Sequence, residues 1–388
     1  MAKKQTRSAK GSGTIRKRSD GRWEARYSLG FDPKTGKQVQ KSIYGKTQKE
    51  VRQKLTAITT EIDNGTYTEP SKTKVSEWLE TWLRDYIGNV KPATVKSYQD
   101  HVKLNIIPYI GTVQLAKLTT PMIQTMYNDL QRDKGLSPKT IKNVHGVLHR
   151  ALEQAQKMGF IRNNPTEAVT LPRIEKKQIK PMEDEELTAF LNAIKGNPYE
   201  LVFYVTVFTG LREGEVLGLT WDCVDFSNGT LLINKQHGKV KGTKEYRFSS
   251  LKNDKPRLLT VADAVMDALR HQKVRQKIWK DVAGSAWDNP DNLVFTTELG
   301  RYLCNQTVYL AFKKVVKSLG LEEVRFHDLR HTFAVNSLKS GDDIKTVQEN
   351  LGHHTAAFTL DTYAHVTSGM KKSSASRMDQ YIKSVTTA

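Results

Sequence analysis

The period of the apolar residues changes along this chain, and the change restricts the folds that the chain can adopt. Apolar and polar residues alternate over residues 23–29, which is the pattern of a half-buried strand. An Asp-Gly pair before this stretch and the sequence DPKTG after it are hairpin turn signals. A T-x-x-E capping box at Thr47 then precedes apolar residues at helical spacing. Residues 1–66 are therefore predicted to form a three-stranded sheet backed by one helix.

The next segment, residues 74–170, has a helical period throughout. Two apolar stripes recur at intervals of three and four residues, the second after a Ser-Pro pair that is typical of a helix start. The stripes comprise Trp78, Leu79, Trp82, Leu83, Tyr86, Ile141, Val144, Val147, Leu148, Ala151, Leu152 and Ala155. We interpret them as the core of an all-helical domain. Residues 171–181, which are charged and contain two prolines, are predicted to be a linker.

The third segment, residues 182–388, mixes both periods. A helix is expected at 183–194, strands of a small sheet are expected at 230–236 and near 247–261, and helices dominate afterwards. The predicted fold class is therefore α+β and multidomain. A sheet-and-helix domain is followed by an all-helical domain and by a mainly helical domain with a small antiparallel sheet.

The charge of the chain favours a polyanionic partner. Lys and Arg number 61 against 41 Asp and Glu, which gives a formal charge of +20 and a pI near 9.7. The first 60 residues hold 16 Lys and Arg but only four acidic residues, so more than half of the excess lies there. A basic arm that only improves solubility is the alternative.

Two sets of basic residues are predicted to contact DNA. A small antiparallel sheet can lie in the major groove, and the polar faces of helices can follow a phosphate backbone. The sheet candidates are Arg16, Lys17, Arg18, Arg22, Arg26 and Lys41, and the helical candidates are Lys96, Lys139 and Lys142. The alternatives are a sheet that touches phosphates alone and lysines that are merely solvated.

Cysteine use and hydropathy bear on the cellular location. Cys223 and Cys304 are far apart and lack metal-ligand spacing, so we expect packing residues in a reducing cytosol. No run of about 18 apolar residues exists, and the basic N-terminus lacks the pattern of a signal peptide. A cytoplasmic protein that stays with the cell's own nucleic acid is expected.

Four short strings in the third segment contain residues suited to chemistry. They are TGLREGE at 209–215, HDLRH at 327–331, LGHH at 351–354 and TLDTYAH at 359–365. In the first string Arg212 and Glu215 are three residues apart, as are His327 and Arg330 in the second, so each pair shares one helical face. Taken singly, each string has a simpler explanation: a surface ion pair, a capping or core histidine, or a packed tyrosine ring.

Taken together, the strings match the needs of metal-free phosphoryl transfer at a phosphodiester. Negative charge builds on the non-bridging oxygens, and the guanidinium groups of Arg212 and Arg330 could hold these oxygens bidentately. A histidine could donate a further hydrogen bond or accept the proton of the nucleophile. Lys252 could protonate the leaving oxygen. The acidic clusters that hold two magnesium ions are absent from these strings, so no metal cofactor is expected.

The set Arg212, Lys252, His327, Arg330, His353 and Tyr363, in this order and spacing, resembles the tyrosine recombinases. The resemblance is to integrases of temperate phages and conjugative transposons, and it extends over most of the chain. It implies that residues 1–66 bind arm-type DNA sites, that 74–170 bind the core site, and that 182–388 are catalytic.

The resemblance also implies a role for each residue of this set. Tyr363 would attack the scissile phosphate and form a covalent 3′-phosphotyrosyl intermediate, with Arg212 and Arg330 holding the phosphate. His327 and His353 would assist, and Lys252 would be the general acid. The supporting acid common in the family matches Glu215. No cofactor or ATP is implied, because the covalent link conserves the phosphodiester energy.

Two of these assignments have competitors within the chain. Lys244 and Lys255 lie near Lys252, and His354 is adjacent to His353, although the LGH pattern favours His353.

The expected partners also follow from the resemblance. They are double-stranded DNA with core and arm attachment sites, three further copies in a tetramer on DNA, an excisionase and a host DNA-bending protein, at the bacterial nucleoid. An apolar stripe at Met378, Tyr381, Ile382 and Val385 could dock on a neighbouring protomer or pack back on its own domain. The alternative functions are a catalytically silent DNA-binding regulator and a type IB-like topoisomerase.

Overall fold

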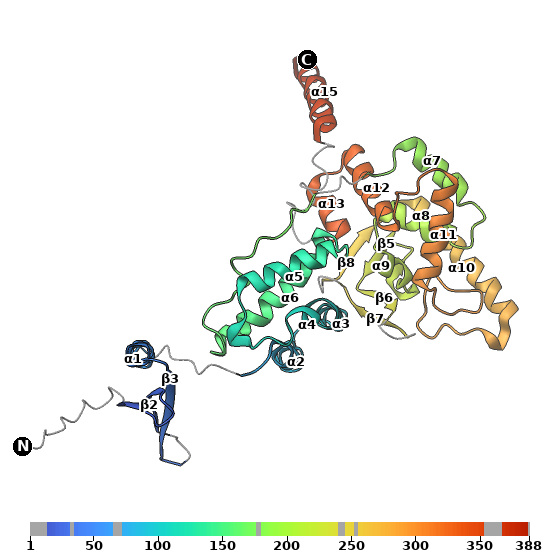
Figure 1. Cartoon of the computed structure of the whole chain (residues 1–388). Coiled ribbons are helices and arrows are strands. Elements are labelled where there is room, and N and C mark those ends of the chain that lie inside the picture. The colour runs from blue at the N-terminus through green and yellow to red at the C-terminus, as the bar shows by residue number, and fades with distance from the viewer. Residues whose placement is uncertain are drawn as a thin grey trace, which may run out of the picture. The chain divides into compact units, whose positions relative to one another are not determined.

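The computed structural model describes residues 14–31, 35–64, 72–175, 180–239, 245–251, 255–352 and 367–386. The chain divides into two compact units, Met1–Glu175 and Lys176–Ala388. The predicted multidomain α+β class is confirmed, since helices predominate and the sheets are small and antiparallel (Figure 1). Within the described residues, no helix combines the length and the apolar character that a membrane span requires.

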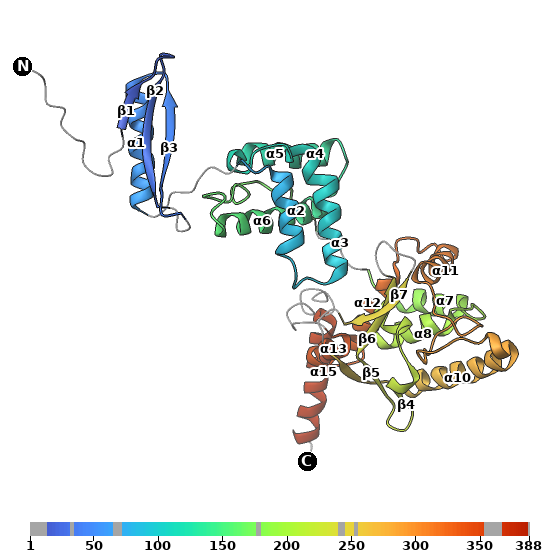
Figure 2. The ribbon, with the colours of Figure 1, turned by 90° about the horizontal axis from the view of Figure 1, so that it is seen from below.

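The first unit begins with the predicted sheet and helix. Its antiparallel strands are β1 (Thr14–Lys17), β2 (Trp23–Phe31) and β3 (Gln38–Gly45), with β2 in the centre. Helix α1 (Gln48–Asp63) lies along one face of this sheet (Figure 2). Its N-terminus is capped as the sequence indicates, because the Thr47 hydroxyl accepts a hydrogen bond from the Glu50 amide at 3.2 Å. The small core joins the two layers and comprises Ala25, Tyr27, Val51 and Leu55.

The rest of the first unit is helical, as predicted. Its helices are α2 (Val75–Asp85), α3 (Pro92–His101), α4 (Ile107–Ile110), α5 (Thr120–Arg132) and α6 (Pro138–Lys157), with a π-helical turn (Val102–Ile106) between α3 and α4. Helix α6 supplies a continuous buried stripe, and the Trp78 indole of α2 donates to the Ala151 carbonyl at 2.8 Å. Ser137 caps α6 by accepting from the Thr140 amide.

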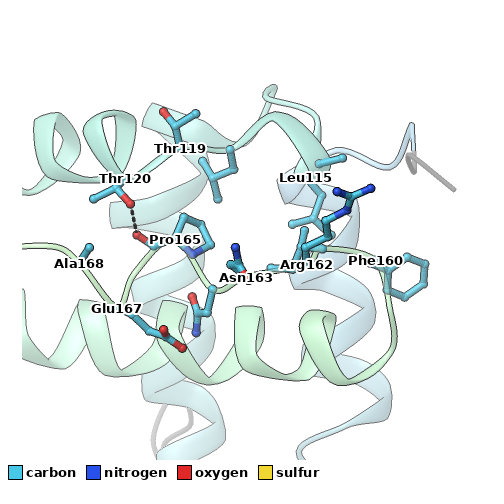
Figure 3. Close-up of a pocket in the computed structure, with 13 residues that line it drawn as sticks. Leu115, Thr119, Thr120, Phe160, Arg162, Asn163, Pro165, Glu167 and Ala168 are labelled. Atoms are coloured by element: carbon cyan, nitrogen blue, oxygen red, sulfur yellow. Dashed lines mark hydrogen bonds between the residues drawn. The ribbon is translucent and has the colours of Figure 1, made fainter. Parts of the chain in front are cut away.

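A cavity of about 690 Å³ lies between the start of α5 and the loop at 160–168 (Figure 3). The Thr120 hydroxyl donates to the Pro165 carbonyl across it at 2.8 Å. Of the predicted catalytic residues that the structure describes, none lines this cavity.

The second unit is mainly helical, and its described residues form two small sheets, whereas one was expected. Strands β4 (Val224–Asp225), β5 (Thr230–Ile233) and β8 (Arg257–Thr260) form the first, and β6 (Lys235–Lys239) and β7 (Tyr246–Ser250) form the second. The helices are α7 (Asp184–Ala193), α8 (Glu200–Thr209), α9 (Glu213–Leu217), α10 (Asp263–Ala283), α11 (Asn305–Ser318), α12 (Phe326–Lys339), α13 (Ile344–Leu351) and α15 (Thr367–Thr386). Helix α8 is buried on most sides and contacts α9, α10 and α12 (Figure 1).

Two glycines end the helices on which the candidate site is built. Gly210 follows α8 and Gly352 follows α13, and both adopt left-handed backbone angles, with φ of 65° and 61°. A Cβ atom at Gly210 would lie 2.4 Å from Phe333 Cδ1 and 2.8 Å from Leu351 Cδ2. The end of α8 therefore approaches α12 and α13 more closely than any side chain would allow.

This close approach predicts an unusually large effect of Gly210→Ala on stability. Gly320→Ala is the matched control, because Gly320 has a similar φ of 71° but no heavy atom within 4 Å of the added Cβ. The left-handed backbone alone should cost about 1–2 kcal/mol in the control. Gly210→Ala should cost clearly more, measured as the midpoint of thermal unfolding of the two full-length variants. Equal losses would show that the contact with Phe333 and Leu351 adds no constraint.

Candidate active site

Arg212 and Glu215 form the first part of the candidate site. Arg212 is the residue before α9, and Glu215 lies one turn into this helix. The Arg212 backbone amide donates to Glu215 Oε2 at 3.0 Å, and its Nη1 donates to Glu215 Oε1 at 2.7 Å. The predicted bracing of the arginine by the acid is therefore present in the structure.

A second arginine, Arg257 at the start of β8, completes the surroundings of this acid. Its Nη1 and Nη2 donate to the two carboxylate oxygens of Glu215 at 3.1 and 2.6 Å. Burial acts to raise the pKa of Glu215, but the hydrogen bonds and charge of Arg257, with the charge of Arg212, lower it to about 2. Glu215 is 1% exposed and stays ionised, so it can fix both guanidinium groups.

Arg330, on α12, is also almost fully buried, with 1% exposure. Its Nη1 donates to the Gly210 carbonyl at 2.7 Å, and its Nη2 donates to the Leu351 carbonyl. A charged group at this depth is tolerated only when hydrogen bonds compensate for lost water. The glycine-capped ends of α8 and α13 supply these acceptors.

The C-terminal end of α13 is held by three arginines from three different elements. Arg257 Nε donates to the Asn350 carbonyl at 2.8 Å, and Arg330 donates to the next carbonyl, that of Leu351. Arg212 Nη2 donates to the Gly352 carbonyl at 3.3 Å. Positive groups at a helix C-terminus satisfy carbonyls that lack helical partners and also match the helix dipole.

His327 lies one turn before Arg330, at the start of α12. Although the residue is exposed, desolvation of its ring and then the charges of Arg330 and Arg212 lower its pKa to about 4. The two guanidinium charges by themselves act in the same direction. The ring packs edge-on against that of His331, with 5.0 Å between centroids. His327 is therefore neutral at pH 7 and can accept a proton.

The predicted catalytic residues fall into two groups in the structure. Arg212, Glu215, His327 and Arg330 come together, since the charges of both arginines act on His327 and both arginines hold the end of α13. The second group, Lys252, His353 and Tyr363, lies outside the described residues. The same holds for two of the nearby competitors, Lys244 and His354. Their neighbours are described. The stretch that contains Lys252 joins β7 to β8, and His353 directly follows Gly352.

Aromatic packing positions the strand that leads to Lys252. The Tyr246 ring on β7 stacks on Tyr302 with 4.5 Å between centroids, and its hydroxyl donates to Cys304 Sγ at 2.9 Å. This hydrogen bond is the main cause that lowers the pKa of Cys304 to about 7. The expectation that Cys304 only fills space is therefore wrong, because its sulfur is a hydrogen-bond acceptor that anchors β7.

Arg257 is the site residue that the sequence reasoning missed. The string KPRLLTV reads as part of a strand and gives Arg257 no helical partner. The available signal was a basic residue at the start of an apolar strand, since an arginine there needs a buried acid.

The predicted DNA-contacting residues of the sheet lie on two different faces. Arg16 pairs across the strands with Glu24, and Arg26 pairs with Ser42, on the face away from α1. Lys17 pairs with Trp23 and Lys41 pairs with Tyr27, so these two lysines begin on the face that α1 covers. The exposed side of the sheet was expected to carry some of the six residues, and Arg16 and Arg26 lie on it, whereas Lys17 and Lys41 lie on the other face.

A buried carboxylate binds the arginines on the face of the sheet away from α1, which we call the open face. Glu24 is 1% exposed and accepts from Ser42 Oγ at 2.8 Å, while Arg16 and Arg26 bind it at 2.7 and 3.2 Å. The Ser42 and Arg16 hydrogen bonds are the main causes that lower the pKa of Glu24 to about 2. At one end of this face, Arg18 and Arg22 lie over the Tyr44 ring.

The three helical candidates differ in their surroundings. Lys96 on α3 forms an exposed ion pair with Asp100 at 3.3 Å, and Lys139 is exposed at the start of α6. Lys142 lines a groove of about 250 Å³ between α3 and α6, together with His101 and Arg150.

Comparisons with known proteins address the identity of this chain. Residues 177–370 match the model of the phage integrase family, and residues 74–131 match that of the phage integrase N-terminal SAM-like domain. A protein of Caldanaerobacter subterraneus subsp. tengcongensis, named tyrosine recombinase XerC-like, is 30% identical over 360 residues, with 87% of this chain and 91% of that protein covered. The ICEBs1 integrase of Bacillus subtilis is 21% identical, with 95% of this chain and 100% of that protein covered.

Solved structures support the fold. The Tn1549 transposon integrase in complex with a circular intermediate DNA has a TM-score of 0.69 at 21% identity, covering 79% of this chain and 99% of that one. A lambda integrase tetramer bound to a Holliday junction gives 0.54 at 20% identity, covering 88% and 96%. The family model matches half of the chain, and a relative that is 30% identical aligns with most of it. This chain therefore belongs to the phage integrase family of tyrosine recombinases, enzymes that cut and rejoin DNA at specific sites.

Proposed function

We propose that this recombinase integrates and excises a mobile element through a covalent 3′-phosphotyrosyl intermediate on Tyr363. The observation that carries the proposal is the convergence of Arg212 and Arg330 on the turn that immediately precedes the stretch with His353 and Tyr363. Two guanidinium groups fixed by buried acceptors are preorganised to stabilise charge on a phosphodiester.

The proposed reaction exchanges one phosphate ester for another. The Tyr363 oxygen attacks the phosphorus, the bond to the 5′-oxygen of the next nucleotide breaks, and a 3′-phosphotyrosine and a free 5′-hydroxyl result. Lys252 gives a proton to the leaving oxygen, and the tyrosine proton passes to a histidine. His327 can take this role because its ring is neutral at pH 7 and lies beside Arg212 and Arg330. His353 donates a hydrogen bond to the phosphate.

We further propose that double-stranded DNA is bound by all three segments. Residues 1–66 bind arm sites through the open face of the sheet, 74–170 bind the core site, and 182–388 catalyse the reaction. The groove beside Lys142 supports a phosphate contact, since it gathers three basic side chains. The DNA lies in the bacterial cytoplasm at the nucleoid, where an excisionase and a host bending protein set the direction of the reaction.

Four protomers are proposed to bridge two duplexes. The lambda integrase tetramer bound to a Holliday junction supports this assembly. Met378, Tyr381, Ile382 and Val385 are each about half exposed on α15, which favours docking on another protomer over packing on their own domain. The mass of the complex formed with two core-site duplexes tests the assembly.

Two other functions fit the sequence less well. A silent regulator has no need of the buried network around Glu215 and Arg330, which holds charged groups at a cost in desolvation. A type IB-like topoisomerase needs no partner duplex, so a separate sheet domain with an arginine-rich open face would be superfluous.

Tyr363→Phe should abolish the covalent intermediate. A nicked suicide duplex that carries the core site of the element traps the intermediate, because the cleaved fragment diffuses away and cannot be religated. Wild-type protein should give an adduct that survives denaturation, and Tyr363→Phe should give none. Tyr381→Phe is the matched control, since Tyr381 is exposed on α15 and is the one later tyrosine. An adduct formed by Tyr363→Phe would place the nucleophile elsewhere.

Arg212→Lys should separate binding from cleavage. Lysine keeps the positive charge but lacks the planar guanidinium that can bind Glu215 and a phosphate at the same time. The rate of DNA cleavage should therefore fall by about 10²–10³-fold. Affinity for the core-site duplex, measured by fluorescence anisotropy, should stay near that of the wild type. Arg270→Lys is the control, because Arg270 pairs with Asp267 on the exposed surface of α10. Normal cleavage by Arg212→Lys would argue against the phosphate clamp.

Deletion of residues 1–66 should reduce the salt dependence of DNA binding. Each lost phosphate contact lowers the slope of log K against log salt by about 0.9. The slope on a duplex with arm and core sites should therefore become shallower, while cleavage of an isolated core site persists. An unchanged slope would contradict the arm-binding role.

A further inference from the structure

Arg257 joins three parts of the candidate site that are distant in sequence. It is the first residue of β8, on the C-terminal side of the stretch that contains Lys252. Its guanidinium binds Glu215 of α9 with two hydrogen bonds, and its Nε binds the Asn350 carbonyl at the end of α13. The side chain is 11% exposed, so these contacts are made largely away from solvent.

The turn after α13 is built closely around this side chain. A Cβ atom at Gly352 would lie 3.1 Å from Arg257 Nη1 and 3.2 Å from its Cδ, and Gly352 has a left-handed φ of 61°. The backbone of this turn therefore rests against the guanidinium and its side-chain stem. Arg257 therefore contacts the last described turn before His353, which follows Gly352 in the sequence.

The same guanidinium also determines how Arg212 is held. Glu215 Oε1 accepts hydrogen bonds from Arg212 Nη1 at 2.7 Å and from Arg257 Nη1 at 3.1 Å. Apart from Arg257, the carboxylate is held among the described residues only by Arg212, through its backbone amide on Oε2 at 3.0 Å and its Nη1 on Oε1. With both of its oxygens bound by Arg257, Glu215 is a fixed reference for Arg212.

A role in stability alone does not account for this arrangement. Buried ion pairs add little net stability compared with apolar residues of similar volume, because desolvation offsets the attraction. The ion pair instead fixes the orientation of its groups, since the planar guanidinium of Arg257 binds the Glu215 carboxylate and a backbone carbonyl at the same time.

We propose that Arg257 is a positioning residue for DNA cleavage. It acts through Glu215 on the orientation of Arg212 and through Asn350 and Gly352 on the start of the stretch that carries His353 and Tyr363. The inference rests on the proposed function of that stretch. It predicts that loss of Arg257 slows the chemical step and leaves DNA affinity largely intact.

The test uses full-length Arg257→Lys and Arg257→Ala proteins. Affinity for the core-site duplex is measured by anisotropy, and adduct formation on the suicide duplex is followed in single turnover at saturating protein. A displacement of about 1 Å can cost about 10²-fold in rate, so both variants should cleave about 10²-fold more slowly with affinities within about threefold of wild type. Lysine should not restore the rate, because it cannot form the fork.

Controls separate this inference from the proposed function. Arg270→Ala removes an arginine from an exposed pair on α10 and should cleave like the wild type. Circular dichroism and thermal unfolding establish folding, and if Arg257→Ala is unfolded the lysine variant decides. The inference is overturned if the Arg257→Lys protein cleaves DNA at the wild-type rate. It is also overturned if the affinity for the core-site duplex falls by the same factor as the cleavage rate. Wild-type protein without a Tyr363-dependent adduct would instead contradict the proposed function.

Discussion

The second unit depends on a single electrostatic constraint, which is that the buried carboxylate of Glu215 must be matched by positive groups. Burial by itself would raise the pKa of this acid, and two guanidinium groups keep it ionised by lowering the pKa to about 2. One of these, Arg212, comes from the same helix start, and the other, Arg257, comes from β8. The fold thereby links a helix, a sheet and the end of α13 through one charged group.

Backbone geometry makes this network possible. Gly210 and Gly352 end α8 and α13 in left-handed conformations and bring the two helix ends together. The carbonyls exposed at these ends accept hydrogen bonds from the arginines, including the buried Arg330. The string TGLREGE thus contains Gly210 together with Arg212 and Glu215, and the string LGHH contains Gly352.

Much of this organisation could be predicted from the sequence. Alternation and helical spacing are local signals, and they identified the first sheet, α1, and the buried stripes of α2 and α6. The ordered set of polar residues identified the family. Register between strands and pairing between distant residues are not local signals. The division of the second unit's strands between two sheets and the partnership of Arg257 with Glu215 were therefore missed, and the faces on which Lys17 and Lys41 lie were left open.

The carboxylate beneath the open face of the N-terminal sheet has a consequence for recognition. Glu24 cancels part of the charge of Arg16 and Arg26 but also restricts the rotamers of both. Ordering a long side chain on binding costs about 0.5–1.5 kcal/mol in entropy, and here much of that ordering is complete before any partner arrives. A face built in this way has a weaker long-range attraction for a polyanion, but its arginine side chains are already ordered. This arrangement favours discrimination between binding sites over general affinity for a polyanion.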